Sequence, residues 1–285
     1  MPSIAILCKP QKPELTTILP ELLLWLKRYG YEPILDPLSA GYLGSGEAVP
    51  RHLMHEMQPE LVIVLGGDGT LLAAARVFAR TQIPILSVNL GSLGFLAEVP
   101  VEELFVTLNS WRDHGCAIDE RAMLHAEVYR SGLVHHEFEA LNDVVISKGT
   151  IARMVSILVK AGDQTVARFS ADGVIVATPT GSTAYNLAAN GPILAPDIDG
   201  MIVTAVCPHH LTVRPLVVRG DAKLTLSVEG IPEQIFLTVD GQEAVELKLG
   251  DELRCCRSRY TIRLIRRSGN SFFDVLRAKL KWGER

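Results

Sequence analysis

Apolar positions along the first 115 residues alternate between short continuous runs and longer stretches with helical spacing. The short runs are typical of buried strands and cover residues 4–8, 32–35, 61–65 and 83–88. The stretches between them cover residues 14–29, 50–57, 70–80 and 101–114. This alternation predicts βα units, so residues 1–115 are expected to form an α/β domain with a Rossmann-like parallel sheet.

The pattern changes near residue 115. From there, many short runs of Val, Ile, Leu and Thr are separated by glycine-containing turns, which predicts a mostly antiparallel, β-rich domain over residues 116–270. Residues 271–285 regain helical spacing, and we expect this closing helix to dock back on the first domain. Residues 38–49 hold three glycines and are expected to form a loop.

Composition excludes several classes of protein. A net charge of -4 without a dense Lys/Arg stripe argues against nucleic-acid binding. The five cysteines show no C-x-x-C spacing, and adjacent Cys255 and Cys256 suit a disulfide framework poorly, so we expect reduced thiols in a cytoplasmic protein. The chain begins in a strand and no apolar run reaches transmembrane length, so no membrane partner is expected.

Residues 66–70 read Gly-Gly-Asp-Gly-Thr and stand between a buried strand and a helix. Such a turn directs backbone N–H groups and the positive end of the helix toward one spot, which suits a phosphate. The carboxylate of Asp68 does not serve anion binding, so it is expected to hold a divalent cation beside the phosphate or to take a proton from a hydroxyl. The structural alternative is a tight βα turn in which Asp68 caps the helix.

Residues 172–186 repeat the strand, turn and helix order, with a turn of Thr, Pro, Gly and Ser. Two turns that can each bind an anion suggest a polyphosphate ligand. The alternative for residues 172–186 is an ordinary helix capped by Ser or Thr. Asn142 and Asp143 stand before another strand, where an amide and a carboxylate can bind a base edge or a ribose diol, although the pair can equally form a plain turn.

Taken together these residues resemble the NAD kinase family. The GGDGT signature, which diacylglycerol and sphingosine kinases and, more distantly, phosphofructokinases resemble, is only part of the match. The match extends in the family's order over nearly the whole chain and includes Gly66–Thr70, Asn89–Leu96, Asn142-Asp143, Asp172–Asn186, Cys207-Pro208-His209, Arg214-Pro215 and Asp240-Gly241-Gln242.

The resemblance implies transfer of the γ-phosphoryl group of ATP, or of polyphosphate in some members, to the 2′-hydroxyl of the adenosine ribose of NAD. It also implies the NAD kinase/diacylglycerol kinase-like fold with the site in the cleft, and assembly into homodimers or homotetramers. Asp68 would be the proton acceptor. The dinucleotide site would be lined by Asp68, Gly69, Asn142, Asp143, Arg153, Asp172, Thr183, Ala184, Tyr185, Asn186, Leu187, Ala188 and Gln242.

Three positions depart from the family pattern. Ala188 replaces a frequent Ser, Asn190 a frequent Gly, and Ser170 a frequent basic residue before the Asp172-Gly173 pair. Because the last change removes a charge, we expect Arg168 or a partner subunit to supply it.

The chemistry is consistent with this interpretation. No Walker lysine follows either turn and no G-x-G-x-x-G opens the first βα unit, which disfavours a P-loop enzyme and redox use of NAD. The histidines lack metal-ligand spacing and are interpreted as structural or surface residues, so Mg²⁺ is expected to arrive with ATP rather than at a protein metal site. A lipid kinase would need an apolar entry for an acyl chain, whereas Asn142, Asp143 and Gln242 favour a polar dinucleotide. A non-catalytic nucleotide sensor would have no use for Asp68, so both alternatives are disfavoured. The sequence does not decide whether ATP or polyphosphate is the phosphoryl donor, or whether NAD or NADH is the acceptor.

Overall fold

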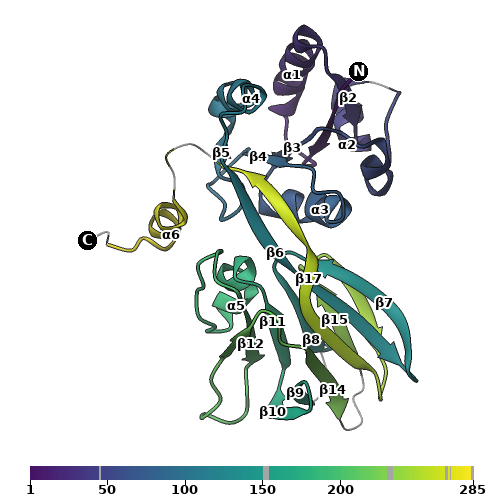
Figure 1. Ribbon diagram of the computed structural model, residues 1–285, viewed down its shortest axis with the longest axis vertical. Coiled ribbons are helices and arrows are strands. Elements are labelled where there is room, and N and C mark those ends of the chain that lie inside the picture. The colour runs from purple at the N-terminus through teal and green to yellow at the C-terminus, as the bar shows by residue number, and fades with distance from the viewer. Residues whose placement is uncertain (45, 150–153, 230–233, 267–268, 270, 284–285) are drawn as a thin grey trace. The chain divides into compact units, whose positions relative to one another are not determined.

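The computed structural model describes the whole chain except residues 45, 150–153, 230–233, 267–268, 270 and 284–285 (Figure 1). It divides into two compact units, which we call unit 1 (residues 1–120 and 261–285) and unit 2 (residues 121–260). The sequence pattern placed these boundaries at residues 115 and 270. The difference arises because two long strands, β6 (Ile118–Arg130) and β17 (Glu252–Ile265), each contribute residues to both units.

Unit 1 contains the predicted parallel sheet. Its strands lie in the order β2 (Glu32–Leu35), β1 (Ser3–Cys8), β3 (Leu61–Gly66) and β4 (Ile85–Asn89). The short strand β5 (Val99–Pro100) and the end of β17 also pair parallel to β4. All six residues of β3 are buried, as expected for a central strand covered on both faces. The α/β prediction for this part of the chain is confirmed.

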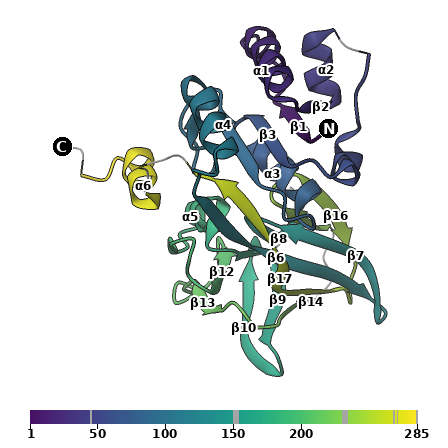
Figure 2. The same cartoon turned by 45° about the horizontal axis from the view of Figure 1, so that its top comes forward.

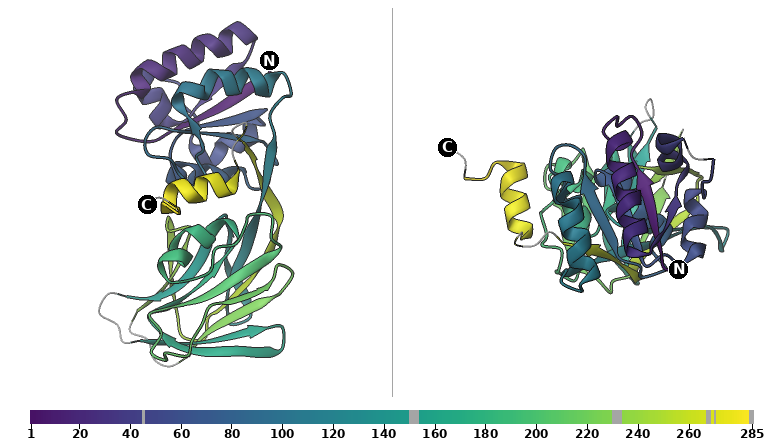
Figure 3. Two further views of the ribbon diagram at one scale, coloured as in Figure 1. Left: turned by 90° about the vertical axis from the view of Figure 1, so that its left-hand side faces the viewer. Right: turned by 90° about the horizontal axis from the view of Figure 1, so that it is seen from above.

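Helices cover both faces of that sheet (Figure 3). Leucines of α1 (Leu15–Tyr29) and α4 (Leu104–Arg112) pack in one buried cluster with alternate residues of β1 and β3. Helix α3 (Asp68–Phe78) contacts the 3₁₀ helix η1 (Arg51–Met57) and lies on the other side. A second 3₁₀ turn, η2 (Val101–Glu103), leads into α4. This arrangement leaves the carboxyl ends of the parallel strands to carry loops.

The predicted loop over residues 38–49 is wrong in its first part, where helix α2 (Pro37–Leu43) forms. The side chain of Asp36 caps it by accepting a hydrogen bond from the backbone N–H of Ser39 at 2.7 Å. Pro37 occupies the first turn, where proline is tolerated, and Gly44 ends the helix with φ of 64°. These end signals outweighed the glycines on which the loop prediction relied.

The closing helix α6 (Phe272–Leu280) belongs to unit 1. A reciprocal capping box starts it: Ser271 Oγ accepts from the N–H of Asp274, and the carboxylate of Asp274 accepts from the N–H of Ser271. The ammonium of Lys279 lies 5.6 Å from the centroid of the Phe95 ring. None of the helices in the described ranges is both long and apolar enough to span a bilayer.

Unit 2 is built from two packed sheets, which confirms the β-rich prediction. One sheet has the order β13 (Leu216–Arg219), β12 (Gly200–Val206), β11 (Gly173–Ala177), β8 (Asp143–Lys148), β15 (Ile235–Val239) and β16 (Glu243–Leu247). The other has the order β10 (Gln164–Ala171), β9 (Val155–Ala161), β14 (Leu224–Glu229), β17, β6 and β7 (Leu133–Ala140). Buried residues of both sheets form one core, including Val144, Val176, Ile157 and Leu226.

Two features of unit 2 carry the predicted site residues. A 3₁₀ turn, η3 (Thr180–Thr183), and the one-turn helix α5 (Tyr185–Ala188) follow β11. Strand β8 starts at Asp143 and pairs with both β11 and β15, so the ends of three neighbouring strands meet there. Figure 2 shows β6 and β7 side by side in this unit, as the register of the hairpin requires.

Candidate active site

The GGDGT turn lies at the carboxyl end of β3. Gly66 ends the strand, extended Gly67 precedes α3, and Asp68 is the first residue of the helix. A Cβ at Gly66 would come within 2.4 Å of Thr70 Oγ1, so this position requires glycine. Loops at the carboxyl ends of parallel strands are where open α/β sheets bind ligands. The turn therefore occupies a position suited to a site.

The carboxylate of Asp68 is held by the loop that follows β4. Its Oδ2 accepts from the N–H of Phe95 at 2.9 Å, and its Oδ1 accepts from the N–H groups of Leu96 at 3.1 Å and Ala97 at 2.9 Å. A Cβ at Gly94 would lie 2.1 Å from Asp68 Oδ1. Two motifs that are separate in sequence thus form one unit, in which three of about four acceptor positions of the carboxylate are filled.

The same loop is fixed from within by Asn89. Its Oδ1 accepts from the N–H of Gly91 at 2.8 Å, and its Nδ2 donates to the carbonyl oxygens of Ser92 at 2.6 Å and Ala97 at 3.4 Å. Asn89 is 8% exposed, so these hydrogen bonds also satisfy a buried amide. Asn89 consequently sets the position of the N–H groups that hold Asp68.

Three lysines that the sequence analysis did not single out stand around the turn. Lys9, Lys12 and Lys279 line a pocket of about 230 Å³ together with Gly66, Gly67 and Asp68. Lys12 Nζ is also fixed by the carbonyl oxygen of Leu90 at 2.9 Å. Ammonium groups beside a helix N-terminus are suited to phosphate oxygens. Lys9 could have been found from sequence, because it directly follows β1 and parallel strands end at the same edge.

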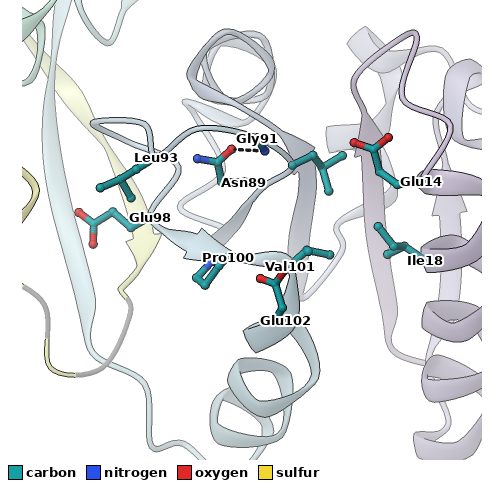
Figure 4. A pocket seen from close by; sticks show the side chains of 10 residues that line it. Glu14, Ile18, Asn89, Gly91, Leu93, Glu98, Pro100, Val101 and Glu102 are labelled. Carbon is teal, nitrogen blue, oxygen red and sulfur yellow. Dashed lines mark hydrogen bonds between the residues drawn. The ribbon is translucent and has the colours of Figure 1, made fainter. Parts of the chain in front are cut away.

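A larger pocket of about 440 Å³ is lined in part by the same loop (Figure 4). It shares Asn89, Leu90, Gly91 and Leu93 with the smaller pocket, and Glu14, Glu98 and Glu102 also line it. Three carboxylates make this pocket unfavourable for a polyphosphate. The smaller, lysine-lined pocket is therefore the better phosphate site in unit 1.

In unit 2 the two predicted turns contact each other directly. The backbone N–H of Thr178 donates to the carbonyl oxygen of Asn142 at 2.9 Å, and Thr178 Oγ1 donates to the carbonyl oxygen of Leu141 at 2.6 Å. A Cβ at Gly181 would lie 2.0 Å from the carbonyl oxygen of Asn142. Glycine at this position thus permits the turn after β11 to pack on the start of β8.

Asp143 and Asp240 form a buried acidic pair at this junction, 4% and 7% exposed. Asp240 accepts from the N–H groups of Leu141 at 2.9 Å, Asn142 at 2.7 Å and Asp143 at 3.1 Å. Burial, and then the charge of Asp240, raise the pKa of Asp143 to about 7. Sequence reasoning identified Asp240 only as part of a motif and missed this supporting role.

Tyr185 and Asp172 lie near Asp143. Partial burial, together with the charges of Cys207, Asp172 and Asp143, raises the pKa of Tyr185. Lys148 Nζ lies 2.9 Å from Asp172 Oδ1 and supplies a positive charge beside the carboxylate. Arg168, expected to replace the charge absent at Ser170, instead forms an ion pair with Glu229 at 2.5 Å. The expectation that Arg168 or a partner subunit supplies the charge absent at Ser170 stays a prediction.

Asn186 has an internal role in the structure. It is fully buried, its Nδ2 donates to the carbonyl oxygens of Ser182 at 3.1 Å and Pro192 at 3.0 Å, and its Oδ1 accepts from Thr204 Oγ1 at 2.7 Å. Both amide donors are thus used within the protein. Its predicted contact with a ligand stays a prediction.

The other predicted residues differ in exposure. Gly69, Ala188 and Gln242 are exposed, and Asn142, Thr183, Ala184 and Leu187 are half-buried. Arg153 lies outside the described residues. The structure thus brings Asn142, Asp143, Asp172 and the turn after β11 together in unit 2. Asp68 belongs to unit 1.

Comparison with known proteins identifies the family. The model of the ATP-NAD kinase N-terminal domain matches residues 4–115, and that of the C-terminal domain matches residues 141–267. The chain is 61% identical to an NAD kinase of Acidobacterium capsulatum and 50% identical to one of Koribacter versatilis, each over the full length of both chains.

Two solved structures share the fold. A yeast NADH kinase complexed with NADH has a TM-score of 0.91 at 24% identity, over 100% of this chain and 89% of its own. An NAD kinase from Archaeoglobus fulgidus in complex with ATP has a TM-score of 0.78 at 22% identity, over 98% of both chains. With both halves of the sequence matched by family models and with full-length relatives, the chain belongs to the ATP-NAD kinase family of phosphotransferases.

Proposed function

We propose that this kinase transfers the γ-phosphoryl group of ATP to the 2′-hydroxyl of the adenosine ribose of NAD, with Asp68 as the proton acceptor. The proposal rests on the GGDGT turn, where the carboxylate of Asp68 lies in a pocket lined by three lysines. A phosphate site alone has no use for a negative charge, whereas phosphoryl transfer to a hydroxyl requires a proton acceptor beside the phosphate.

The reaction forms a bond between the 2′ oxygen and the γ-phosphorus and breaks the bond between that phosphorus and the β–γ bridging oxygen. ADP leaves, and the proton of the 2′-hydroxyl passes to the carboxylate of Asp68. With three N–H groups on its oxygens, Asp68 keeps about one acceptor position for this proton. The loop over residues 89–97 thus orients the base as well as forming the edge of the pocket.

The phosphates of the donor are proposed to bind at Lys9, Lys12 and Lys279. Mg²⁺ enters as part of the Mg–ATP substrate, held chiefly by phosphate oxygens and water. Ammonium groups recognise phosphate charge without selecting the nucleoside, which leaves room for polyphosphate as a second donor.

The acceptor is proposed to bind at the junction of unit 2. Asp143, whose pKa is about 7, is partly protonated at neutral pH and can donate as well as accept a hydrogen bond. That property suits the hydroxyls of a ribose, and the half-buried Asn142 beside it suits a base edge. The remaining proposed contacts come from Gly69, Arg153, Asp172, residues 183–188 and Gln242.

The protein is further proposed to act in the cytoplasm as a homodimer or homotetramer. The five free cysteines are consistent with a reducing compartment. Analytical ultracentrifugation would measure the oligomeric state.

A coupled assay for NADP formation tests the reaction. Purified protein with Mg–ATP should convert NAD to NADP, and diacylglycerol should not be phosphorylated. Since one structural neighbour is an NADH kinase, NADH is included as an alternative acceptor, and polyphosphate as an alternative donor. Absence of NADP with every donor would contradict the proposal.

A further inference from the structure

A second cluster of polar side chains lies on the hairpin of β6 and β7, among residues to which the proposed kinase function assigns no role. The strand register pairs His125 with Glu139 and Glu127 with Glu137. Because side chains alternate across a strand, these four residues share one face of the hairpin. The opposite face carries Ala126 and other buried residues of the core. The hairpin thus presents one histidine and three carboxylates together.

This arrangement has an excess of negative charge. Glu127 and Glu137 are directly opposite each other, which is unfavourable for like charges. His125 can offset one of the charges at most: its Nδ1 lies 3.0 Å from Glu139 Oε1 and its Nε2 lies 3.6 Å from Glu127 Oε1. Two arginines line the same pocket: Arg257 pairs with Asp199 at 2.8 Å, and the guanidinium of Arg259 lies over the Tyr260 ring.

Glu139 provides an independent indication of a missing ligand. The residue is only 7% exposed, and its Oε2 atom is buried without a hydrogen-bond partner in the part of the chain that the structure describes. Its other oxygen contacts His125, so the carboxylate points into the cluster. A buried, unpartnered carboxylate oxygen is unfavourable unless a cation or a donor reaches it.

We propose that His125, Glu137 and Glu139 bind a divalent transition-metal ion of the zinc type. One ligand atom from each of the three residues lies within 4.8 Å of the others. Rotation of the exposed Glu137 side chain can bring its carboxylate closer to the ligand atoms of His125 and Glu139. Imidazole nitrogen and carboxylate oxygen are both zinc ligands, whereas Mg²⁺ prefers oxygen alone.

Cys256 of β17 lines the same pocket. Cys256 does not belong to the group of ligand atoms within 4.8 Å of one another, so the fourth coordination position is left to water. The ligands come from two strands, 12 to 14 positions apart, which explains why spacing along the sequence gave no sign of a metal site.

Isothermal titration of the metal-free full-length protein with Zn²⁺, with a parallel titration with Mg²⁺, is the first test. We expect one Zn²⁺ bound per chain, no comparable binding of Mg²⁺, and a melting temperature that rises with the concentration of free Zn²⁺. Absence of stoichiometric Zn²⁺ binding would overturn the proposal.

Variants then locate the site. His125→Ala, Glu139→Gln and Glu137→Gln should each weaken Zn²⁺ binding by at least about 100-fold, as expected when one of three protein ligands is lost. Glu137 is exposed, so Glu137→Gln tests the site even if changes at buried Glu139 impair folding. The matched control is His136→Ala, a histidine of the same hairpin on the opposite face.

Unchanged affinity in Glu137→Gln, or an equal loss in His136→Ala, would overturn the assignment of the ligands. None of these residues belongs to the proposed kinase machinery, so NADP formation measured on the same samples separates failure of this proposal from failure of the proposed function.

Discussion

Asp68 in unit 1 and Asp240 in unit 2 each hold three consecutive backbone N–H groups with one carboxylate. Asp68 receives those of residues 95–97, and Asp240 those of residues 141–143. The two differ in exposure, because Asp68 is half-buried and lines a pocket whereas Asp240 is 7% exposed. The same local arrangement can therefore present a reactive carboxylate in one place and shape a binding surface in the other.

The neighbours of the two carboxylates differ as well. Lysines surround Asp68, whereas Asp240 lies beside the buried carboxyl group of Asp143 and helps to raise its pKa to about 7. The lysines of the first site suit a carboxylate that stands beside phosphate groups. The second site keeps an acid that is partly neutral, which suits hydrogen bonding to a sugar. The predictions below test this contrast from the largest expected effect to the smallest.

The largest effect is expected for the pH dependence of stability at Asp143. Its folded pKa of about 7 is above the unfolded value of 3.8, so its stabilising contribution is full below pH 3.8 and is lost as the pH rises through 7. Asp143→Asn should match the native protein near pH 4 and be more stable at pH 8 by at most about 4 kcal/mol. Urea unfolding across this range measures the difference, and parallel curves would contradict a raised pKa.

Asp240→Ala should lower the free energy of unfolding by about 2–3 kcal/mol. The change leaves three backbone N–H groups without their acceptor, a cost reduced by the removal of the charge beside Asp143. Urea unfolding at pH 7 measures it, with Asp163→Ala at an exposed turn as the control. A loss no greater than in the control would mean that Asp240 does not support the junction.

Adding a methyl group at two glycines should separate the two sites kinetically. A Cβ at Gly94 would lie 2.1 Å from Asp68 Oδ1, so Gly94→Ala should lower kcat by about tenfold, or 1.4 kcal/mol. A Cβ at Gly181 would lie 2.0 Å from the carbonyl oxygen of Asn142, so Gly181→Ala should raise KM for NAD by a similar factor.

Steady-state kinetics with both substrates varied measures these effects. Gly41→Ala, in α2 with open space around its Cβ, is the control. The same kinetic defect in both glycine variants would erase the proposed distinction between the two sites.

The smallest effect concerns release of the product. If Asp68 lies beside the 2′ position, it repels the 2′-phosphate of NADP by about 1 kcal/mol. Asp68→Ala should then tighten NADP binding relative to NAD by about fivefold, and less so at high salt. Paired calorimetric titrations at two salt concentrations measure the ratio, and an unchanged ratio would place Asp68 away from the 2′ position.

Much of the fold could be predicted because hydrophobic periodicity is a local signal. The runs that became β1, β3 and β4 are buried and continuous, and the helices between them have clear apolar faces. Helix α2 was missed because its glycines were weighted above Asp36 and Pro37, which start it. The motifs themselves were visible because each is a contiguous stretch.

The supports of the site could not be predicted because they join distant residues. Asp240 and Leu141 are 99 positions apart in sequence, and Lys12 and Leu90 are 78 apart. Asn186 was predicted as a ligand contact from the family resemblance, but its burial and its partners could be known only from the folded chain. Sequence therefore indicates which residue types matter more readily than which of them touch a ligand.

The most direct test of the account is the turnover of Asp68→Asn. Loss of the proton acceptor should lower kcat by at least about 10²-fold, or 2.7 kcal/mol, while calorimetric NAD affinity stays close to that of the native protein. The free energy of unfolding should fall by only about 1 kcal/mol, because Asn can still accept from Leu96 and Ala97 and loses only the hydrogen bond from Phe95. The control is Asp113→Asn at an exposed position of the same unit. Near-normal turnover would remove Asp68 from the mechanism, and a loss of turnover accompanied by an equal loss of stability would reduce its role to holding the loop over residues 95–97.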